Sequence, residues 1–236
     1  MTKRTILLTG VSGALGSAVL EMLIPHQDNL VLIARKIDTT VQFLESVSYP
    51  KNQYIVLTGD VTSEDSLKDI FSKAIEKFHG IDTVIHTAGT YMGGKPVYLS
   101  DNQMWDTLFT LNAKSLFLLS KFAVPEMIKQ QSGVIITIGS RGALEVSPGS
   151  GFYGASKSAT IKLTQTLAKE LIDKNIRVNC ILPSTIDTDS NRKMMPNKNF
   201  NLWVKPSSIA NLIEFLISDK ATDITGAAIP IYGKEF

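Results

Sequence analysis

The sequence contains very little cysteine and histidine, which limits its chemistry. Among 236 residues there is one cysteine, Cys180, so an internal disulfide is excluded. Cys180 lies in the apolar segment 178–182, which indicates a buried thiol rather than a nucleophile. The three histidines, His26, His79 and His86, do not have the spacing of metal ligands, so no metal site is expected.

Long apolar runs and basic clusters are also missing from the sequence. No stretch approaches the ~18 apolar residues of a membrane span, and the run 6–8 is too short for a signal peptide. The formal net charge is +2, and no compact run of basic residues suggests a nucleic-acid partner. We therefore expect a cytoplasmic protein that binds neither membrane nor nucleic acid.

What the sequence does contain is a regular alternation of short apolar runs with longer helical patterns. The apolar runs are continuous, which is typical of parallel strands that are covered on both faces. Alternation of strands and helices implies crossover connections. We expect one α/β domain over residues 1–236, with a doubly wound, mainly parallel sheet of about seven strands and helices on both faces. Strands are predicted at 5–9, 30–34, 53–58, 83–86, 134–138, 177–182 and 228–231.

One long helix is predicted to begin near Ser100, where Ser100 and Gln103 could form a capping box, and to run toward Pro125. A second long helix begins near Gly151. Both carry large apolar residues around much of their circumference, more than one sheet-facing stripe requires. This pattern predicts a homodimer or homotetramer in which part of these helices meets another subunit.

The first predicted strand ends in a glycine-rich turn, 9–16, and a helix follows. Gly10 permits a tight turn, Gly13 lets the backbone approach a pyrophosphate, and Gly16 allows the helix to pack closely on the strand. The N-terminus of that helix would face the phosphates with free N–H groups and a partial positive charge. In this context the turn predicts a nucleotide site.

The residues after the second strand indicate which nucleotide is bound. Enzymes that take NAD usually place an acid here for the ribose 2′-hydroxyl, whereas this chain has Ala34 and Arg35. Arg35 can pair with a 2′-phosphate, so NADP(H) is expected in preference to NAD(H); the alternative is that Arg35 is a solvated surface base. Further along, Asp60 and Val61 could hold adenine, and small residues follow the fourth strand at 86–89.

Tyr153 and Lys157 predict a proton donor. Residues four apart share a helix face, so the Lys157 ammonium can lie beside the Tyr153 phenol. A free phenol has a pKa near ~10, and a nearby positive charge would lower that pKa. Ser140 lies thirteen residues before Tyr153, and Asn112 lies further upstream. In a reduction, Tyr153 would protonate a carbonyl oxygen while Ser140 donates a hydrogen bond to it.

Together these residues resemble the short-chain dehydrogenase/reductase family over nearly the whole chain, from Thr5 to Tyr232. The shared motifs are the glycine turn, Asp60-Val61, Ala88-Gly89, Asn112, Ser140, Tyr153, Lys157, Asn179, Pro183 and Thr188. The resemblance implies a Rossmann-like domain, a nicotinamide cofactor and hydride transfer to or from a carbonyl or alcohol carbon of a small molecule. It also implies that Lys157 holds the nicotinamide ribose and that Asn112 steadies a water leading to Lys157.

The resemblance assigns two sets of site residues. The catalytic set is Asn112, Ser140, Tyr153 and Lys157. The cofactor set is Gly10, Ser12, Gly13, Ala14, Leu15, Gly16, Arg35, Asp60, Val61, Ala88, Gly89, Tyr153, Lys157, Pro183, Ile186 and Thr188. The chain departs from the common pattern at Ala14, which replaces a glycine, at His86-Thr87, which replace two asparagines, and at Ser184, which replaces a glycine.

The glycine spacing and the segment 187–196 are also similar to the dihydropteridine reductases of this family. Those enzymes generally have an acid where this chain has Ala34-Arg35, and they generally lack the serine found here as Ser140. Three functions therefore stay open. They are an NADP(H)-dependent carbonyl reductase or alcohol dehydrogenase, a quinonoid pteridine reductase, and a non-enzymatic dinucleotide sensor.

A long irregular stretch at 184–206 is predicted to be a substrate lid. It carries Met194, Met195, Phe200 and Trp203, which would suit an apolar substrate. We expect the part from Ser190 to about Phe200 to be mobile without ligand and to close over the substrate, bringing Met194 or Met195 and Trp203 toward the nicotinamide. Arg141 and Arg192 are available for an acidic group of the substrate.

Overall fold

The computed structural model describes residues 3–235, which form a parallel sheet of seven strands. The strand order is β3-β2-β1-β4-β5-β6-β7, so the winding reverses direction beside β1, as in dinucleotide-binding folds. The strands are β1 (Thr5–Thr9), β2 (Asn29–Ile33), β3 (Tyr54–Leu57), β4 (Thr83–His86), β5 (Gly133–Ile138), β6 (Ile176–Pro183) and β7 (Ala228–Ile231). Each predicted strand is present with bounds that differ by at most one residue at either end. The predicted fold class is confirmed.

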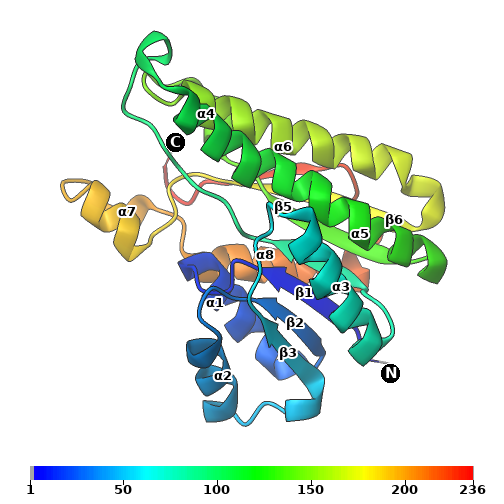
Figure 1. Ribbon diagram of the computed structural model, residues 1–236. Helices are drawn as coiled ribbons and strands as arrows, with labels where there is room; N and C mark the ends of the chain where they lie inside the picture. Colours follow the sequence, from blue (N-terminus) through cyan, green and yellow to red (C-terminus); the bar gives the residue numbers. More distant parts are fainter. Residues whose placement is uncertain (1–2, 236) are drawn as a thin grey trace.

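Helices cover both faces of the sheet (Figure 1). One face packs against α1 (Ala14–Leu23), α2 (Ile37–Ser46) and α8 (Pro206–Ile217), and the other against α3 (Glu64–Phe78), α5 (Ser115–Gln130) and α6 (Gly151–Glu170). In β1, Ile6 and Leu8 belong to the first apolar cluster and Leu7 to the second. Side chains alternate along a strand, and both faces are covered, so the apolar run in the sequence is continuous.

The cap predicted for the helix near Ser100 is wrong. The helix is α4 (Asn102–Phe109), and its cap is Asp101, whose carboxylate accepts a hydrogen bond from the Met104 N–H at 2.8 Å. The Ser100 hydroxyl instead donates to the Pro96 carbonyl at 3.0 Å. Serine and aspartate cap helices about equally well, so their neighbouring positions could not be ranked from the sequence.

The long helix that was expected to run from near Ser100 toward Pro125 is interrupted by a π turn and continues beyond Pro125. After α4, a π-helical turn (Thr110–Lys114) precedes α5, and Pro125 lies inside α5 rather than at its end. The Ser115 N–H donates to the Thr110 carbonyl, five residues back, which is the π-type bond. Such single π turns are frequent at functional sites, and this one carries Asn112.

The segment 184–206 leaves β6, contains α7 (Asp189–Met194) and returns to α8. Its two ends are bonded to each other, and we call these joined ends the base of the segment. Ile186 and Val204 pair as a parallel bridge, and the Asp187 N–H donates to the Val204 carbonyl at 2.8 Å. Trp203 is only 5% exposed and packs on the Phe200 ring, with centroids 4.8 Å apart. Trp203 therefore belongs to this base, and the expectation that it moves with the lid is not supported.

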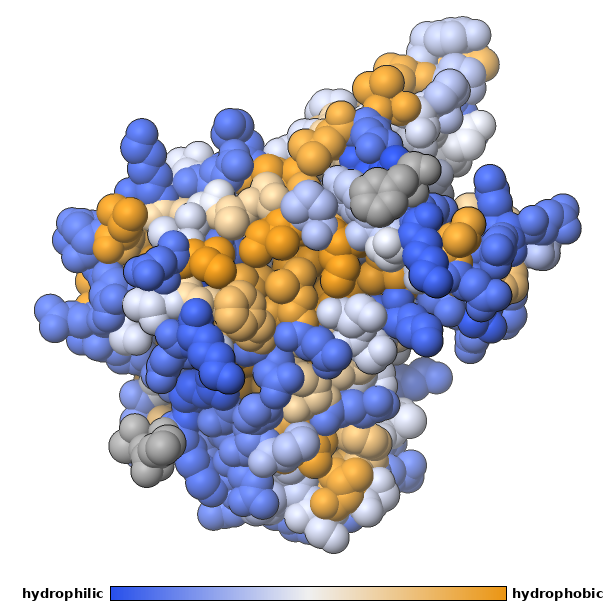
Figure 2. Space-filling view, turned by 180° about the vertical axis from the view of Figure 1, so that it is seen from behind, coloured by the Kyte–Doolittle hydropathy of each residue, from blue (hydrophilic) through white to orange (hydrophobic). Residues whose placement is uncertain are grey.

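The loop 87–101 between β4 and α4 projects from the body of the molecule (Figure 1). It is joined to the loop before α6, because the Gly94 N–H donates to the Gly149 carbonyl at 2.9 Å. Tyr98 and Leu99 on this loop are exposed. Figure 2 shows apolar side chains in a band across the rear surface and on the projecting end. No helix within residues 3–235 is long and apolar enough to cross a membrane, and the cytoplasmic location stays a prediction.

Candidate active site

The predicted site residues gather at the carboxyl edge of the sheet. Thr9 at the end of β1 is paired with His86 at the end of β4, and His86 is paired with Thr137 near the end of β5. The loops that carry Gly10 and Ser140 therefore leave the sheet on the same side. Open α/β sheets bind ligands at this edge, next to the strand where the winding reverses.

The glycine turn forms a cradle in which backbone atoms touch. Gly10 has a φ of +71°, and a Cβ there would lie 2.7 Å from Thr87 Oγ1. A Cβ on Gly16 would lie 2.1 Å from the Gly10 carbonyl oxygen, so α1 can pack against the turn only with glycine at this position. The Gly13 N–H donates to the Gly10 carbonyl at 2.9 Å, and no side chain caps α1. The helix start at Ala14 can therefore direct free N–H groups at a phosphate.

Other predicted cofactor residues lie in the turn after β1 and in the segments that follow β2 and β3. Ser12 is exposed beside the start of α1, and Leu15 is half-buried there. Arg35 is exposed just after β2, and it has no ion pair within residues 3–235. The Asp60 carboxylate accepts hydrogen bonds from the Thr62 N–H at 2.8 Å and the Thr62 hydroxyl at 2.6 Å. Val61 is buried in the core.

The remaining cofactor candidates lie on the opposite side of β1. The Ala88 N–H donates to Thr9 Oγ1 at 3.2 Å, which brings the segment after β4 against the glycine turn. Pro183 ends β6, and Ile186 forms the bridge at the base of the lid segment. The Thr188 hydroxyl accepts from the Asn191 N–H at 3.1 Å and so caps α7.

Ser140 and Tyr153 come together as predicted. Ser140 Oγ accepts from the Gly142 N–H at 3.0 Å and also shares a hydrogen bond with Tyr153. Burial raises the pKa of Tyr153, the Ser140 hydrogen bond lowers it in part, and Tyr91 adds to the increase. The expected net lowering of this pKa is therefore wrong for the protein alone, because burial outweighs the favourable contacts.

Tyr91 is a neighbour of Tyr153 that sequence reasoning missed. Its ring meets the Tyr153 ring edge-on, with centroids 4.9 Å apart, and almost half of its surface is exposed. The available signal was its position two residues after Gly89, on the loop that leaves the ligand-binding edge of the sheet. Tyr91 therefore forms a wall beside the phenol.

Lys157 is buried one helical turn after Tyr153. Its ammonium donates to the Ile138 carbonyl at 2.8 Å. Burial lowers the pKa of Lys157 from 10.5 to about 8, and the buried Cys180 opposes this change. A Cβ on Gly89 would lie 3.2 Å from Lys157 Nζ and 3.1 Å from Asn112 Oδ1, so Gly89 lets both side chains approach the chain closely.

Asn112 is fixed in the π turn by four hydrogen bonds. Its amide nitrogen donates to the Thr90 carbonyl and to Ser156 Oγ, each at 3.0 Å. Its amide oxygen accepts from the Thr90 N–H at 2.9 Å. Its backbone carbonyl accepts from the Thr160 hydroxyl at 2.8 Å.

The two arginines that could have met an acidic substrate both have partners inside the protein. Arg141 pairs with Glu145 at 2.7 Å and donates to the Glu235 backbone carbonyl. Arg192 makes two bonds to the Asp187 carboxylate, at 2.6 and 2.8 Å.

This geometry agrees with the comparisons with known proteins. The model of the short chain dehydrogenase family matches residues 4–199, which is most of the chain.

The chain belongs to the short chain dehydrogenase family.

The relatives extend the match to the whole chain. The 3-oxoacyl-[acyl-carrier-protein] reductase FabG of Thermotoga maritima is 31% identical over 244 residues, covering 98% of this chain and 96% of that protein. Dehydrogenase/reductase SDR family member 4 of Homo sapiens is 28% identical over 246 residues, covering 99% and 87%. Membership of the short chain dehydrogenases with relatives of this kind shows an oxidoreductase that acts on C=O or CH–OH groups.

Solved structures of the family have the same fold. The short-chain dehydrogenase/reductase described as a glucose/ribitol dehydrogenase from Brucella melitensis has a TM-score of 0.90 at 29% identity, over 100% of this chain and 98% of that one. ElxO, solved with NADP bound, also has a TM-score of 0.90, at 24% identity over 98% of each chain, and supports the fold alone.

Proposed function

We propose that the protein is an NADP(H)-dependent oxidoreductase that moves a hydride between nicotinamide and a carbonyl or alcohol carbon, with Tyr153 as general acid and base. The observation that carries this proposal is the hydrogen-bonded pair of Ser140 and Tyr153, with the buried Lys157 one helical turn further along α6. These groups lie at the same edge of the sheet as a turn whose Gly10 and Gly16 leave no room for side chains. A phenol at such an edge can exchange a proton with an oxygen atom of a bound substrate.

Each side chain has a role that follows from its contacts. The raised pKa of Tyr153 keeps its phenol protonated at neutral pH, the form required for reduction. Because Ser140 Oγ accepts from Gly142, its own hydrogen can be donated to the substrate oxygen as charge develops there. When bound, nicotinamide supplies or accepts the hydride. The Lys157 ammonium and a water on the Asn112 carbonyl would replace the proton that Tyr153 releases.

The cradle suits a dinucleotide, and Arg35 favours the phosphorylated form. The exposed Arg35 has no ion pair within residues 3–235, so its guanidinium is available for a 2′-phosphate. Ala34 before it carries no charge that would repel this group. The residues that would hold the rest of the dinucleotide are Gly10, Gly13, Gly16, Asp60, Val61, Ala88, Lys157, Ile186 and Thr188.

We also propose that the segment 184–206 is a substrate lid whose moving part is 190–200. The bridge between Ile186 and Val204 and the buried Trp203 hold both ends of the segment in place. Between them Met194 is 56% exposed, although it is a large apolar side chain. A substrate under this segment would cover that surface and exclude water from the reacting carbon.

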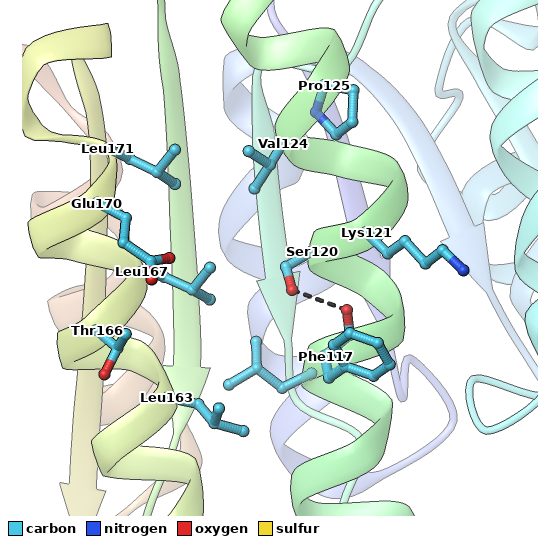
Figure 3. A pocket seen from close by; sticks show the side chains of 11 residues that line it. Phe117, Ser120, Lys121, Val124, Pro125, Leu163, Thr166, Leu167, Glu170 and Leu171 are labelled. Atoms are coloured by element: carbon cyan, nitrogen blue, oxygen red, sulfur yellow. Dashed lines mark hydrogen bonds between the residues drawn. The ribbon is translucent and has the colours of Figure 1, made fainter.

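A second copy of the chain is the proposed occupant of the groove between α5 and α6. Figure 3 shows the side chains of the two helices facing one another across this groove, which holds about 440 Å³. Its walls are mostly apolar; Phe117 is 53% exposed and Leu163 is 36% exposed. The Ser120 hydroxyl is turned back onto the Phe117 carbonyl at 2.8 Å, which removes a polar group from the surface. This face would pair with its copy across a two-fold axis.

The relatives suggest the first substrates to test. Several of them are 3-oxoacyl-[acyl-carrier-protein] reductases, so we propose a 3-oxoacyl thioester as the leading candidate. NADPH oxidation should be followed with such a thioester, a panel of aldehydes and ketones, and quinonoid dihydropterin. We expect turnover of at least one carbonyl substrate by the wild type and none by Tyr153→Phe, with NADPH bound equally by both. Turnover of quinonoid dihydropterin alone, or unchanged turnover in Tyr153→Phe, would contradict the proposal.

A further inference from the structure

His86 is a buried side chain that the proposed reaction does not use. It ends β4 and is 3% exposed. Its Nδ1 lies 2.8 Å from Thr9 Oγ1, and its Nε2 lies 2.9 Å from Ser115 Oγ. Thr9 precedes the glycine turn, and Ser115 follows the π turn. The imidazole therefore spans the distance between the two parts of the site.

The hydrogen bonds around His86 have only one consistent direction. Ser115 donates its single hydroxyl hydrogen to the Leu111 carbonyl at 2.6 Å, so Ser115 Oγ can only accept from Nε2 of His86. The ring hydrogen of the neutral imidazole then lies on Nε2, and Nδ1 is an acceptor. Nδ1 takes the hydrogen of the Thr9 hydroxyl, whose oxygen accepts from the Ala88 N–H at 3.2 Å. Every polar atom of this buried chain is satisfied when the imidazole is neutral with its hydrogen on Nε2.

The surroundings keep His86 neutral. Burial, together with the smaller effect of the positive charge of Lys157, lowers the pKa of His86 to about 3. The groups that face the ring are the Thr9 and Ser115 hydroxyls, and Lys157 is the charged group within electrostatic reach. A second positive charge here would also leave the Thr9 hydrogen without an acceptor.

The series of hydrogen bonds from Thr9 through His86 and Ser115 to Leu111 ends at two functional parts of the site. At one end, Thr87 Oγ1 donates to the Thr9 carbonyl at 2.6 Å, directly before Gly10. At the other end, Leu111 directly precedes Asn112. The amide of Asn112 is tied to the segment after β4 through Thr90. A shift of the π turn would therefore move Asn112 relative to both the cradle and Lys157.

We propose that His86 is a positioning residue, a neutral imidazole of fixed tautomer that sets the distance between the glycine cradle and the π turn of Asn112. It acts through Ser115 and Thr9 and touches neither substrate nor cofactor. The consequence for the reaction rests on the proposed function, whereas the tautomer and the position of the π turn do not.

Three variants separate this role from simple support of the fold. His86→Phe keeps a ring but makes neither the hydrogen bond to Thr9 nor the one to Ser115. Ser115→Ala removes only the hydrogen bond between the imidazole and the π turn. His86→Gln offers one acceptor and one donor that could replace both bonds. We expect His86→Phe and Ser115→Ala to lower kcat about tenfold or more, to raise the solvent deuterium isotope effect on kcat, and to leave the NADPH dissociation constant within about twofold. His86→Gln should restore most of kcat. The control is His26→Gln, because His26 is a surface residue paired with Glu214.

Measurements without substrate test the geometry by itself. Nitrogen-15 NMR of the wild-type imidazole should show hydrogen on Nε2 and no protonation down to about pH 5. The pKa of Lys157, measured by NMR of labelled lysine side chains, should shift in His86→Phe and Ser115→Ala but not in His26→Gln. Hydrogen on Nδ1, or an unchanged Lys157 pKa together with an unchanged kcat in Ser115→Ala, would overturn the proposal. If the wild type reduces no substrate, the proposed function fails, while these measurements still decide the role of His86. If His86→Phe does not fold, Ser115→Ala and the wild-type NMR spectrum decide the role of His86.

Discussion

Replacing Lys157 with methionine should abolish activity and at the same time stabilise the protein at neutral pH. Burial lowers the Lys157 pKa from 10.5 to about 8, and each pKa unit corresponds to about 1.4 kcal/mol. At pH 7 the buried ammonium therefore lowers the free energy of unfolding by about 3 kcal/mol. The variant also loses the bond to the Ile138 carbonyl, which we take as about 1–2 kcal/mol. The net gain for Lys157→Met is then about 1–2 kcal/mol.

The pH dependence distinguishes this effect from improved packing. The folded-state pKa lies below the unfolded-state value, so between about pH 8 and pH 10.5 the unfolded chain binds a proton that the folded chain does not. Wild-type stability gains from this group as pH rises through that window, whereas below it both states are protonated and the penalty is constant. Lys157→Met lacks the group, so its advantage should fall by about 2 kcal/mol between pH 7 and pH 10 and change sign.

The assay is urea unfolding without cofactor, at one protein concentration, of the wild type, Lys157→Met and Lys162→Met. Lys162 is exposed on the same helix, so its replacement should change the free energy of unfolding by less than about 0.5 kcal/mol at either pH. A Lys157→Met protein that is less stable than the wild type at pH 7, or a difference that does not depend on pH, would refute the reasoning.

Three other outcomes follow from the structure. Arg35→Ala should erase a preference of NADPH over NADH of a few kcal/mol, measured by fluorescence titration, whereas Lys36→Ala should keep most of it; equal affinities in the wild type would contradict the role of Arg35. Phe117→Asp should reduce the mass found by light scattering to the 25.8 kDa of one chain, whereas Phe215→Asp on α8 should not, and a wild type already of that mass would exclude the pairing. Limited proteolysis should cut first within 190–200, and NADPH with substrate should slow that cut; equal cutting in both states would count against a lid.

The fold could be predicted from the sequence because its strands are buried on both faces. Continuous apolar runs such as Ile6-Leu7-Leu8 have a clear length and end at glycine or polar residues, so the strand bounds were found almost to the residue. The parallel arrangement then places the ends of β1, β4, β5 and β6 at one edge, which is where the predicted site residues lie. Spacing along one helix was sufficient to place Tyr153 and Lys157 one turn apart on α6.

The parts that could not be predicted depend on contacts between distant segments. The π turn inserts a residue into a helix whose sequence is helical throughout, and its stabilising bond from Thr160 comes from another helix. The pKa of Tyr153 depends on how completely the loops around Tyr91 bury the phenol, which periodicity does not describe. His86 looked like one departure from a family motif, and its partners Thr9 and Ser115 are known only from the structure.

The order of the strands has a consequence for how the chain refolds. Thr9 and His86 are separated by 77 positions, yet their contact joins the cradle to the rest of the site. Closing a loop of that length must precede the pairing of β1 with β4, and contacts of such high sequence separation form slowly. Helix formation measured by circular dichroism should therefore recover early after dilution from denaturant, and catalytic activity should return in the last phase. Recovered activity then reports completion of the whole sheet and not of any one segment.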